Sequence, residues 1–290
     1  MQIKRKPEWL RKKIDLGGQQ FMRQLLADLQ LNTVCQQAAC PNIGECFAAG
    51  QASFLILGTR CTRQCSFCNV QKHRLADAVD ADEPQRLAQA VQRLQLGHVV
   101  ITSPTRDDLL DGGAKHYVAV MEAIRRLNPQ TRVELLIPDF GGNEQSLAAV
   151  LAAAPDIIAH NLETVPRLYH IRKGADYRRS LALLQKAAQA EPAIAVKSGF
   201  MLGLGENEDE IMELMADIFA TGCRYLSIGQ YLAPSKAHHP VAEYLSPDFF
   251  QKLHEKAMQM GFLHTESAPY VRSSYHAANY VSSFGVAGFS

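Results

Sequence analysis

The chain has 290 residues, of which 47% are hydrophobic and 20% charged, and its formal net charge is +1. This length and apolar content suffice for a large buried core, which excludes a disordered chain and a small disulfide-stapled domain. The near-neutral charge argues against a broad basic face for nucleic acid. No apolar run approaches the roughly 20 residues that span a bilayer. We therefore expect no nucleic-acid partner and no membrane span.

In chain order, residues 1–50 differ from the remainder. A basic start is followed by a short helical pattern that ends near residue 29 and by a polar, cysteine-bearing stretch over residues 32–50. Pro41 and Gly44 in that stretch favour tight turns over a helix. The basic start is either a solvated end or a docking surface for an acidic partner.

From residue 53 onward, short apolar runs rich in β-branched residues alternate with longer helical patterns. We expect strands over residues 53–57, 98–102, 132–137, 156–160, 193–201 and 224–229. We expect helices over residues 84–96, 114–127, 144–153, 177–190, 208–221 and 247–260, and a last strand over 262–266. Six βα repeats predict an α/β fold with a parallel sheet, either doubly wound or curved into a barrel. In such folds the chemistry lies at the carboxyl ends of the strands.

Cysteine usage is the most informative part of the composition. Six of the seven cysteines lie between Cys35 and Cys68, in two groups of three. No secretion signal with an apolar core is recognisable, so we expect a cytoplasmic protein whose thiols stay reduced and bind metal. The remaining cysteine, Cys223, is expected to be a small buried residue.

The second triplet consists of Cys61, Cys65 and Cys68 in the sequence GTRCTRQCSFCNV, directly after the first expected strand. Zinc normally takes four protein ligands, and His73 is the nearest candidate for a fourth. Three thiolates instead suit a 4Fe–4S cluster that leaves one iron open to a small molecule. Buried structural thiols and a zinc knuckle are the alternatives.

The first triplet consists of Cys35, Cys40 and Cys46 in the sequence VCQQAACPNIGECF. A second incomplete set of thiols so near the first indicates a second cluster. Its fourth ligand comes from elsewhere in the chain or is absent.

These residues carry a resemblance to a known family. The Cys-x3-Cys-x2-Cys loop, with Phe67 before its last cysteine, resembles the radical S-adenosylmethionine (SAM) superfamily. Its pairing with the upstream Cys-x4-Cys-x5-Cys set is similar to the lipoyl synthase family. Further segments that resemble this family are KPEWLR at 6–11, RDDLLDGGA at 106–114, HNLETVPRLY at 160–169, KSGFMLGLGE at 197–206 and VRSSYHA at 271–277.

The resemblance covers almost the whole chain and implies a fold. It implies a partial (β/α)6 TIM-like barrel of the radical SAM type over residues 51–235. An N-terminal extension over residues 1–50 would carry the cysteines of an auxiliary cluster. A C-terminal extension over residues 236–290 would carry the Arg-Ser-Ser-Tyr segment.

The resemblance also implies an activity. Members of the family insert sulfur at C6 and C8 of an octanoyl group that is attached to a lysine of a lipoyl-carrier protein. The carrier is the glycine cleavage H protein or a dehydrogenase E2 lipoyl domain. A low-potential donor such as ferredoxin or flavodoxin supplies the electron that cleaves SAM to a 5′-deoxyadenosyl radical, because no side chain can activate such C–H bonds.

Two 4Fe–4S clusters are implied, and the resemblance assigns their ligands. The cluster that binds SAM would be held by Cys61, Cys65 and Cys68. The auxiliary cluster, which donates its sulfide, would be held by Cys35, Cys40, Cys46 and Ser274. Ser273 is the neighbouring alternative to Ser274, and the sequence does not decide between them.

Polar residues at the strand ends are candidates for binding SAM: Thr102, Ser103, Asn161, Glu163 and Lys197. Thr, Ser and Asn often cap helices after strands, which is the alternative role. Three other functions compete: a sulfur-inserting radical enzyme with a different substrate, a two-cluster electron carrier, and a zinc-binding module.

Overall fold

The computed structural model describes residues 6–10, 19–74, 76–190, 194–275 and 277. Internal contacts divide the chain into two compact units. The first unit is Lys13–Ile158, and the second combines Met1–Lys12 with Ala159–Ser290. The division into residues 1–50, 51–235 and 236–290 stays a prediction.

The first unit is built on a largely parallel sheet. Its strands follow one another in the order β1 (Asn32–Thr33), β2 (Ser53–Leu55), β5 (His98–Thr102), β6 (Arg132–Leu136) and β7 (Ile157–Ala159), of which β7 ends one residue beyond the unit. The edge strand β1 is antiparallel to β2, whereas β2, β5 and β6 pair in parallel. A separate two-stranded sheet pairs β3 (Arg60–Cys61) with β4 (Gln71–Lys72).

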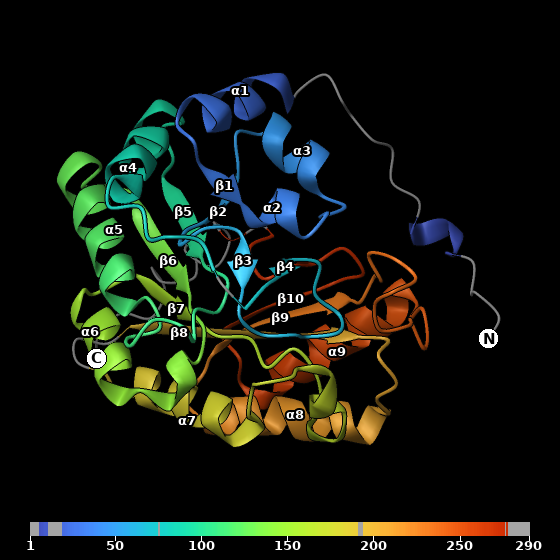
Figure 1. Ribbon diagram of the computed structural model, residues 1–290. Coiled ribbons are helices and arrows are strands. Elements are labelled where there is room, and N and C mark those ends of the chain that lie inside the picture. The colour runs from blue at the N-terminus through green and yellow to red at the C-terminus, as the bar shows by residue number, and fades with distance from the viewer. Residues whose placement is uncertain (1–5, 11–18, 75, 191–193, 276, 278–290) are drawn as a thin grey trace. The chain divides into compact units, whose positions relative to one another are not determined.

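Helices cover the strands of the first unit. They are α1 (Gln20–Asp28), α2 (Val34–Gln37), α3 (Ile43–Ala48), α4 (Glu83–Arg93), α5 (Ala114–Leu127) and α6 (Glu144–Ala152), with a 3-10 turn η3 (Phe140–Gly142). Helix α5 packs between α4 and α6, and the three lie side by side along β5 and β6 (Figure 1). Leu87 and Val91 of α4 and Val120 and Ile124 of α5 are fully buried, as the spacing of four residues on one helix face requires.

The second unit has three parallel strands in the order β8 (Ala195–Leu202), β9 (Tyr225–Gln230) and β10 (His264–Ser267). Its helices are α7 (Tyr177–Ala188), α8 (Glu208–Ala220) and α9 (Pro247–Met260), with 3-10 turns η1 (Glu8–Leu10) and η4 (Pro166–Ile171). Side chains of Asp176, Asn207 and Ser246 cap the three α-helices by accepting a backbone N–H bond. The expected strands and helices from residue 53 onward are therefore confirmed, with small shifts at their ends; residue 193 lies outside the described residues.

The turn predicted from Pro41 and Gly44 is present at Pro41, but the prediction is wrong at Gly44, which lies in α3. Cys35 lies in α2 and Cys46 in α3, and Cys40 lies between the two helices. The Thr33 side chain accepts the Gln36 N–H bond and so starts α2. Pro41 precedes α3 instead of interrupting it. Helices of four and six residues are too short to show a hydrophobic period in the sequence.

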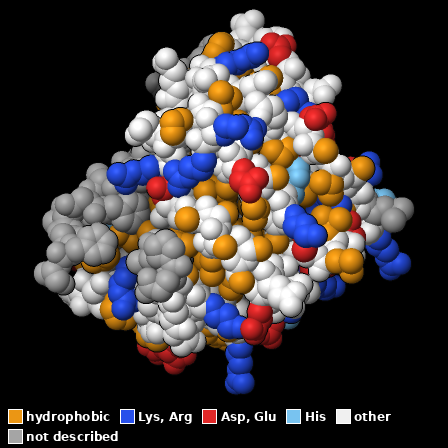
Figure 2. Space-filling view, turned by 90° about the vertical axis from the view of Figure 1, so that its left-hand side faces the viewer, with side chains coloured by type: hydrophobic (Ala, Val, Ile, Leu, Met, Phe, Trp, Pro, Cys, Tyr) orange, Lys and Arg blue, Asp and Glu red, His pale blue; other side chains and the backbone are white. Residues whose placement is uncertain are grey.

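Over the face drawn in Figure 2, Lys and Arg side chains stand among acidic, apolar and uncharged ones. Within the described ranges, no helix combines the length and the apolar character needed to cross a membrane. Cys223 is fully buried between α8 and β9, as predicted.

The segment after β10 approaches β9 very closely at Gly229. A Cβ atom added to Gly229 would overlap the carbonyl oxygen of Val271. One residue further, the Gln230 N–H group donates to the carbonyl oxygen of Pro269 at 3.2 Å. Only glycine permits this approach, which fixes the chain just ahead of the Arg-Ser-Ser-Tyr segment.

We predict that Gly229→Ala lowers the free energy of unfolding by about 2 kcal/mol, because the added methyl group forces the backbone at Val271 away. Gly97→Ala is the matched control, since no heavy atom lies within 4 Å of the position of its Cβ. Its effect is expected to stay within about 0.5 kcal/mol. Urea denaturation of the three proteins measures both, and equal stability of the Gly229 variant and the wild type would contradict the close approach.

Candidate functional site

The loop that carries the second cysteine triplet follows β2, and the chain turns sharply at Leu57 before it enters this loop. Leu57 is buried and has a φ of 65°, a left-handed conformation that costs energy for any residue with a Cβ. Its N–H group donates to the Glu83 carboxylate at 2.9 Å, and its carbonyl oxygen accepts from Arg106 at 2.9 Å. His116 lies 2.7 Å from the same Glu83 oxygen. Buried charged side chains thus hold both backbone polar groups of the turn.

The next residue, Gly58, continues the turn. Its φ is 85°, and a Cβ at this position would overlap the carboxylate of Asp77. That carboxylate accepts the Thr59 N–H bond at 2.8 Å and lies 3.3 Å from the Arg60 guanidinium. The chain is therefore anchored on both sides of the turn before it enters the cysteine loop.

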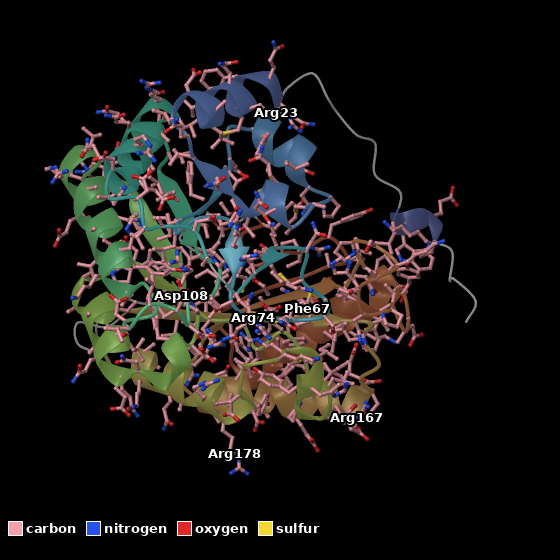
Figure 3. The ribbon with its side chains drawn as sticks, in the orientation of Figure 1. Arg23, Phe67, Arg74, Asp108, Arg167 and Arg178 are labelled. Atoms are coloured by element: carbon pink, nitrogen blue, oxygen red, sulfur yellow. The ribbon has the colours of Figure 1, made fainter. Side chains whose placement is uncertain are left out.

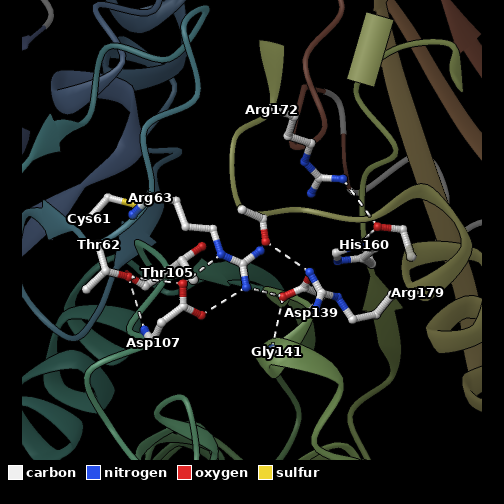
Figure 4. Close-up of polar contacts among 12 residues, drawn as sticks. Cys61, Thr62, Arg63, Thr105, Asp107, Asp139, Gly141, His160, Arg172 and Arg179 are labelled. Carbon is white, nitrogen blue, oxygen red and sulfur yellow. Dashed lines mark hydrogen bonds and ion pairs between the residues drawn. The ribbon is translucent and has the colours of Figure 1, made fainter. Parts of the chain in front are cut away.

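Arg63, between the first two thiols of the loop, is buried and makes three short contacts. Its guanidinium donates to Asp107 at 2.8 and 2.9 Å and to Asp139 at 2.5 Å (Figure 4). Burial alone would lower the pKa of Arg63, but the hydrogen bonds to Asp107 and Asp139 raise it above its ordinary value. Arg63 is therefore a permanent cation inside the loop.

The three cysteines of the second triplet are half-buried, and none of them is in a disulfide. Figure 3 shows Phe67 among the side chains of this loop, and its ring is also half-buried. Among the described residues, no three Cys, His, Asp or Glu side chains are grouped so as to hold one metal ion. A 4Fe–4S cluster does not need such a group, since each thiolate binds a different iron. Three thiols outside any disulfide, within one anchored loop, therefore fit a cluster with an open iron.

The first triplet lies in the same unit and is tied to the second. The Asn69 side chain, next to Cys68, donates to the carbonyl oxygen of Gln37 in α2 at 2.8 Å. Cys35 lies in that same helix and is buried, while Cys40 and Cys46 are half-buried. Burial raises the pKa of the Cys35 thiol, and the nearby Cys40 adds to the effect. A metal that binds here has to displace the Cys35 proton.

The predicted SAM residues of the first unit follow β5. Thr102 is buried, and its carbonyl oxygen accepts the Ile56 N–H bond at 2.9 Å. Ser103 is half-buried, and its hydroxyl lies 3.0 Å from the hydroxyl of Tyr117. The main chain just beyond them, at Thr105, accepts the Thr62 N–H bond from the cysteine loop at 3.0 Å.

The structure brings the predicted residues of the second unit together. The Asn161 amide donates to Glu163 at 3.1 Å and to the hydroxyl of Ser273 at 2.5 Å. The ammonium group of Lys197, 1% exposed, donates to the carbonyl oxygen of Ser273 at 2.5 Å. Ser274 follows in the same turn and is half-buried.

Glu163 stands in a strained and poorly hydrated position. Its φ is 67°, and its backbone forms an isolated bridge to Phe200 in β8. Loss of hydration raises the pKa of its carboxyl group, and the attraction of Arg172, the Asn161 hydrogen bond and Arg272 offset this only in part. Non-glycine residues in such conformations are concentrated at functional sites.

Sequence reasoning missed the residues that hold the cysteine loop: Glu83, Arg106, Asp107, Asp139 and Arg63. Arg63 stands within the motif itself, and Arg106, Asp107 and Asp139 follow expected strands within five residues, which is where a search for charged anchors would have found them. Their partners are distant in sequence, so no local spacing indicates the pairs.

Comparisons with known proteins identify the family of the chain. Residues 55–218 match the model of the Radical SAM superfamily. The lipoyl synthase of Trichlorobacter lovleyi is 66% identical over 97% of this chain and 100% of its own length. That of Geobacter sulfurreducens is 62% identical over 97% and 92%, and that of Caldicellulosiruptor saccharolyticus 52% identical over 96% and 97%.

Solved structures at low identity share the fold. Methylornithine synthase is 14% identical with a TM-score of 0.57, covering 86% of this chain and 75% of its own. Streptococcus suis SuiB bound to S-adenosylmethionine is 12% identical with a TM-score of 0.58, covering 85% and 55%. The predicted α/β fold, a partial barrel of the radical SAM type, is thereby confirmed. The chain belongs to the radical SAM superfamily and, within it, to the lipoyl synthase family.

Proposed function

We propose that this enzyme completes lipoyl groups: it replaces C–H bonds at C6 and C8 of a protein-bound octanoyl-lysine with C–S bonds. The observation that carries the proposal is the pair of thiol triplets in one compact unit, with no disulfide among them and with a hydrogen bond from Asn69 to Gln37 between their segments. One SAM-binding cluster needs only one triplet. The other triplet therefore has a separate role, which we propose is to hold the cluster that supplies the sulfur.

The membership in the superfamily implies one 4Fe–4S cluster and SAM. We propose Cys61, Cys65 and Cys68 as the ligands of this cluster. When bound, the cluster and SAM together supply the radical oxidant that an unactivated C–H bond requires. The chain itself holds three thiolates in an anchored, half-buried loop and leaves one coordination position open. Thr102, Ser103 and Glu163 are the proposed contacts of SAM.

We propose a second cluster on Cys35, Cys40, Cys46 and Ser274. The contacts of Ser273 support the choice of Ser274, because Asn161 already engages the Ser273 hydroxyl and Lys197 its carbonyl oxygen. Asn161 and Lys197 were also candidates for SAM. Their proposed task is to hold the serine segment, since their polar groups bind it.

The partners follow from the reaction. The substrate is proposed to be an octanoylated carrier domain, either the glycine cleavage H protein or a dehydrogenase E2 lipoyl domain. A low-potential protein such as ferredoxin or flavodoxin is proposed as the electron donor, and the cytoplasm as the location of the enzyme. An extended acyl-lysine arm is the part of the carrier that reaches the reacting carbons.

We predict that the anaerobically purified wild type carries about eight irons and eight sulfides per chain and forms lipoyl groups on an octanoylated carrier. Cys40→Ala is expected to keep about half of the iron and to cleave SAM, but to form no lipoyl product. Cys65→Ala is expected to lose SAM cleavage. Metal analysis, and mass spectrometry of the carrier and of 5′-deoxyadenosine, measure these outcomes.

The matched control is Cys223→Ala, since Cys223 is a buried thiol outside both triplets. This variant is expected to keep the full iron content and the full activity. Lipoyl formation by Cys40→Ala at the wild-type rate would contradict the different roles proposed for the two clusters.

A second prediction concerns the serine ligand. Ser274→Cys is expected to keep the iron content but to form lipoyl groups at least tenfold more slowly, because a soft thiolate releases cluster iron less readily than an alkoxide. Ser273→Ala keeps the proposed ligand and is expected to stay within about threefold of the wild-type rate. Single-turnover assays measure both rates, and an unimpaired Ser274→Cys variant would refute the idea that a labile ligand is needed.

A further inference from the structure

Tyr117 of helix α5 places its hydroxyl group at the carboxyl ends of two neighbouring strands. The side chain is fully buried. Its hydroxyl oxygen lies 3.0 Å from that of Ser103, which directly follows β5, and 3.2 Å from the carbonyl oxygen of Leu136, the last residue of β6. Thr102 and Leu136 are partners in the parallel ladder. The phenol therefore bridges the two strands where their ladder ends.

The ring of Tyr117 is fixed by its packing. It meets the ring of Phe140, in η3, edge to face at a centroid distance of 6.2 Å and an interplanar angle of 88°. Phe140 is itself buried, and a Cβ atom on Gly112 would lie 3.0 Å from its ring. Buried aromatic pairs of this kind have a defined geometry. The phenol oxygen is thus held at one place beside Ser103.

The single proton of Tyr117 can serve one acceptor at a time. The Leu136 carbonyl oxygen can only accept a hydrogen bond, whereas a serine hydroxyl both donates and accepts. Both short contacts are hydrogen bonds at once in one arrangement: Tyr117 donates to Leu136, and Ser103 donates to Tyr117. Burial raises the pKa of Tyr117, so the phenol keeps the proton that this arrangement requires. The proton of Ser103 is thereby directed into the protein.

Ser103 is the more open of the two predicted SAM residues that end β5. It is half-buried, whereas Thr102 is 7% exposed. With its proton directed to Tyr117, the Ser103 oxygen can only accept a hydrogen bond from a ligand. SAM carries donor groups on its ammonium, adenine and ribose parts, and one carboxylate that only accepts. A serine oriented in this way favours a donor group of SAM over its carboxylate.

We infer that Tyr117 is a positioning residue for SAM: it orients the Ser103 hydroxyl so that the serine oxygen accepts a hydrogen bond from a donor group of SAM. The inference rests on the proposed contact of Ser103 with SAM. Tyr117 is fully buried, so it acts through Ser103. A polar group that is already oriented in the free protein loses less entropy on binding, which strengthens the binding of its ligand.

The test is equilibrium dialysis of SAM against the full-length holoenzyme, together with the rate of 5′-deoxyadenosine formation at saturating SAM. Tyr117→Phe keeps the ring and removes the hydroxyl group. The Ser103 hydroxyl then rotates freely, so we expect the Kd for SAM to rise about fivefold, the effect of one neutral hydrogen bond. The kcat at saturating SAM and the iron content are expected to stay within about twofold of the wild type.

Thr131→Val is the matched control. Thr131 is also buried, and its hydroxyl donates to the Leu96 carbonyl oxygen at 2.7 Å, but it precedes β6 and lies at the amino ends of the strands. Its loss is expected to lower stability as Tyr117→Phe does and to leave the Kd unchanged. A merely structural role of Tyr117 would lower the cluster content and the apparent kcat, and leave the Kd of the remaining holoenzyme unmoved.

A double-variant cycle tests whether Tyr117 acts through Ser103. Ser103→Ala is expected to raise the Kd about fivefold on its own. In the Ser103→Ala background, Tyr117→Phe is expected to add less than about twofold, because the hydroxyl that it orients is already absent. Independent effects would multiply to about 25-fold, and that result would overturn the inference.

The outcomes separate this inference from the proposed function. A wild type that binds no SAM contradicts both. A wild type that forms lipoyl groups, with an unchanged Kd in Tyr117→Phe or in Ser103→Ala, overturns the inference alone, as does an equal rise of the Kd in Thr131→Val. A raised Kd in both single variants, little further rise in the double variant and unchanged binding by the control establish that Tyr117 orients Ser103.

Discussion

The left-handed backbone of Leu57 is the constraint on which the cysteine site depends. A parallel strand has to end there, and the chain has to turn immediately into a loop that presents three thiols. The turn is costly for a leucine, and its two polar backbone groups are out of reach of water. Glu83 and Arg106 bind these groups from two other segments of the first unit, so the turn is stable only when the surrounding elements have formed.

Buried charged side chains hold both the cysteine loop and the serine segment in place. Arg63 fixes the thiol loop through two aspartates, and Lys197 fixes the serine segment through the carbonyl oxygen of Ser273. Ion pairs in the interior often add little net stability, because desolvation consumes most of their attraction. They do fix the orientation of the segments that they join, because a buried charge without its partner is strongly disfavoured. The cysteine loop has no apolar core of its own, so contacts of this kind hold it in one orientation.

Much of this architecture is predictable from the sequence. The strand over 98–102 contains the apolar run Val-Val-Ile, and helices begin at capping residues such as Asn143 and Asn207, so apolar runs and caps locate these elements. The two cysteine triplets are evident from their spacing. The short helices that carry Cys35 and Cys46 are not, because four to six residues show no period. The contact of Arg63 with Asp139 is also not predictable, since the two residues are 76 residues apart and only the fold pairs them.

We propose that one cluster of this enzyme generates a radical and that the other is consumed as a source of sulfur. Isotope tracing tests it most directly. Both clusters are assembled with 34S sulfide, unbound sulfide is removed, and one turnover on an octanoylated carrier is carried out in the presence of ordinary sulfide. Both sulfur atoms of the lipoyl product are then expected to be 34S. A product that contains only ordinary sulfur would show that the sulfur comes from solution and that the second thiol triplet has another purpose.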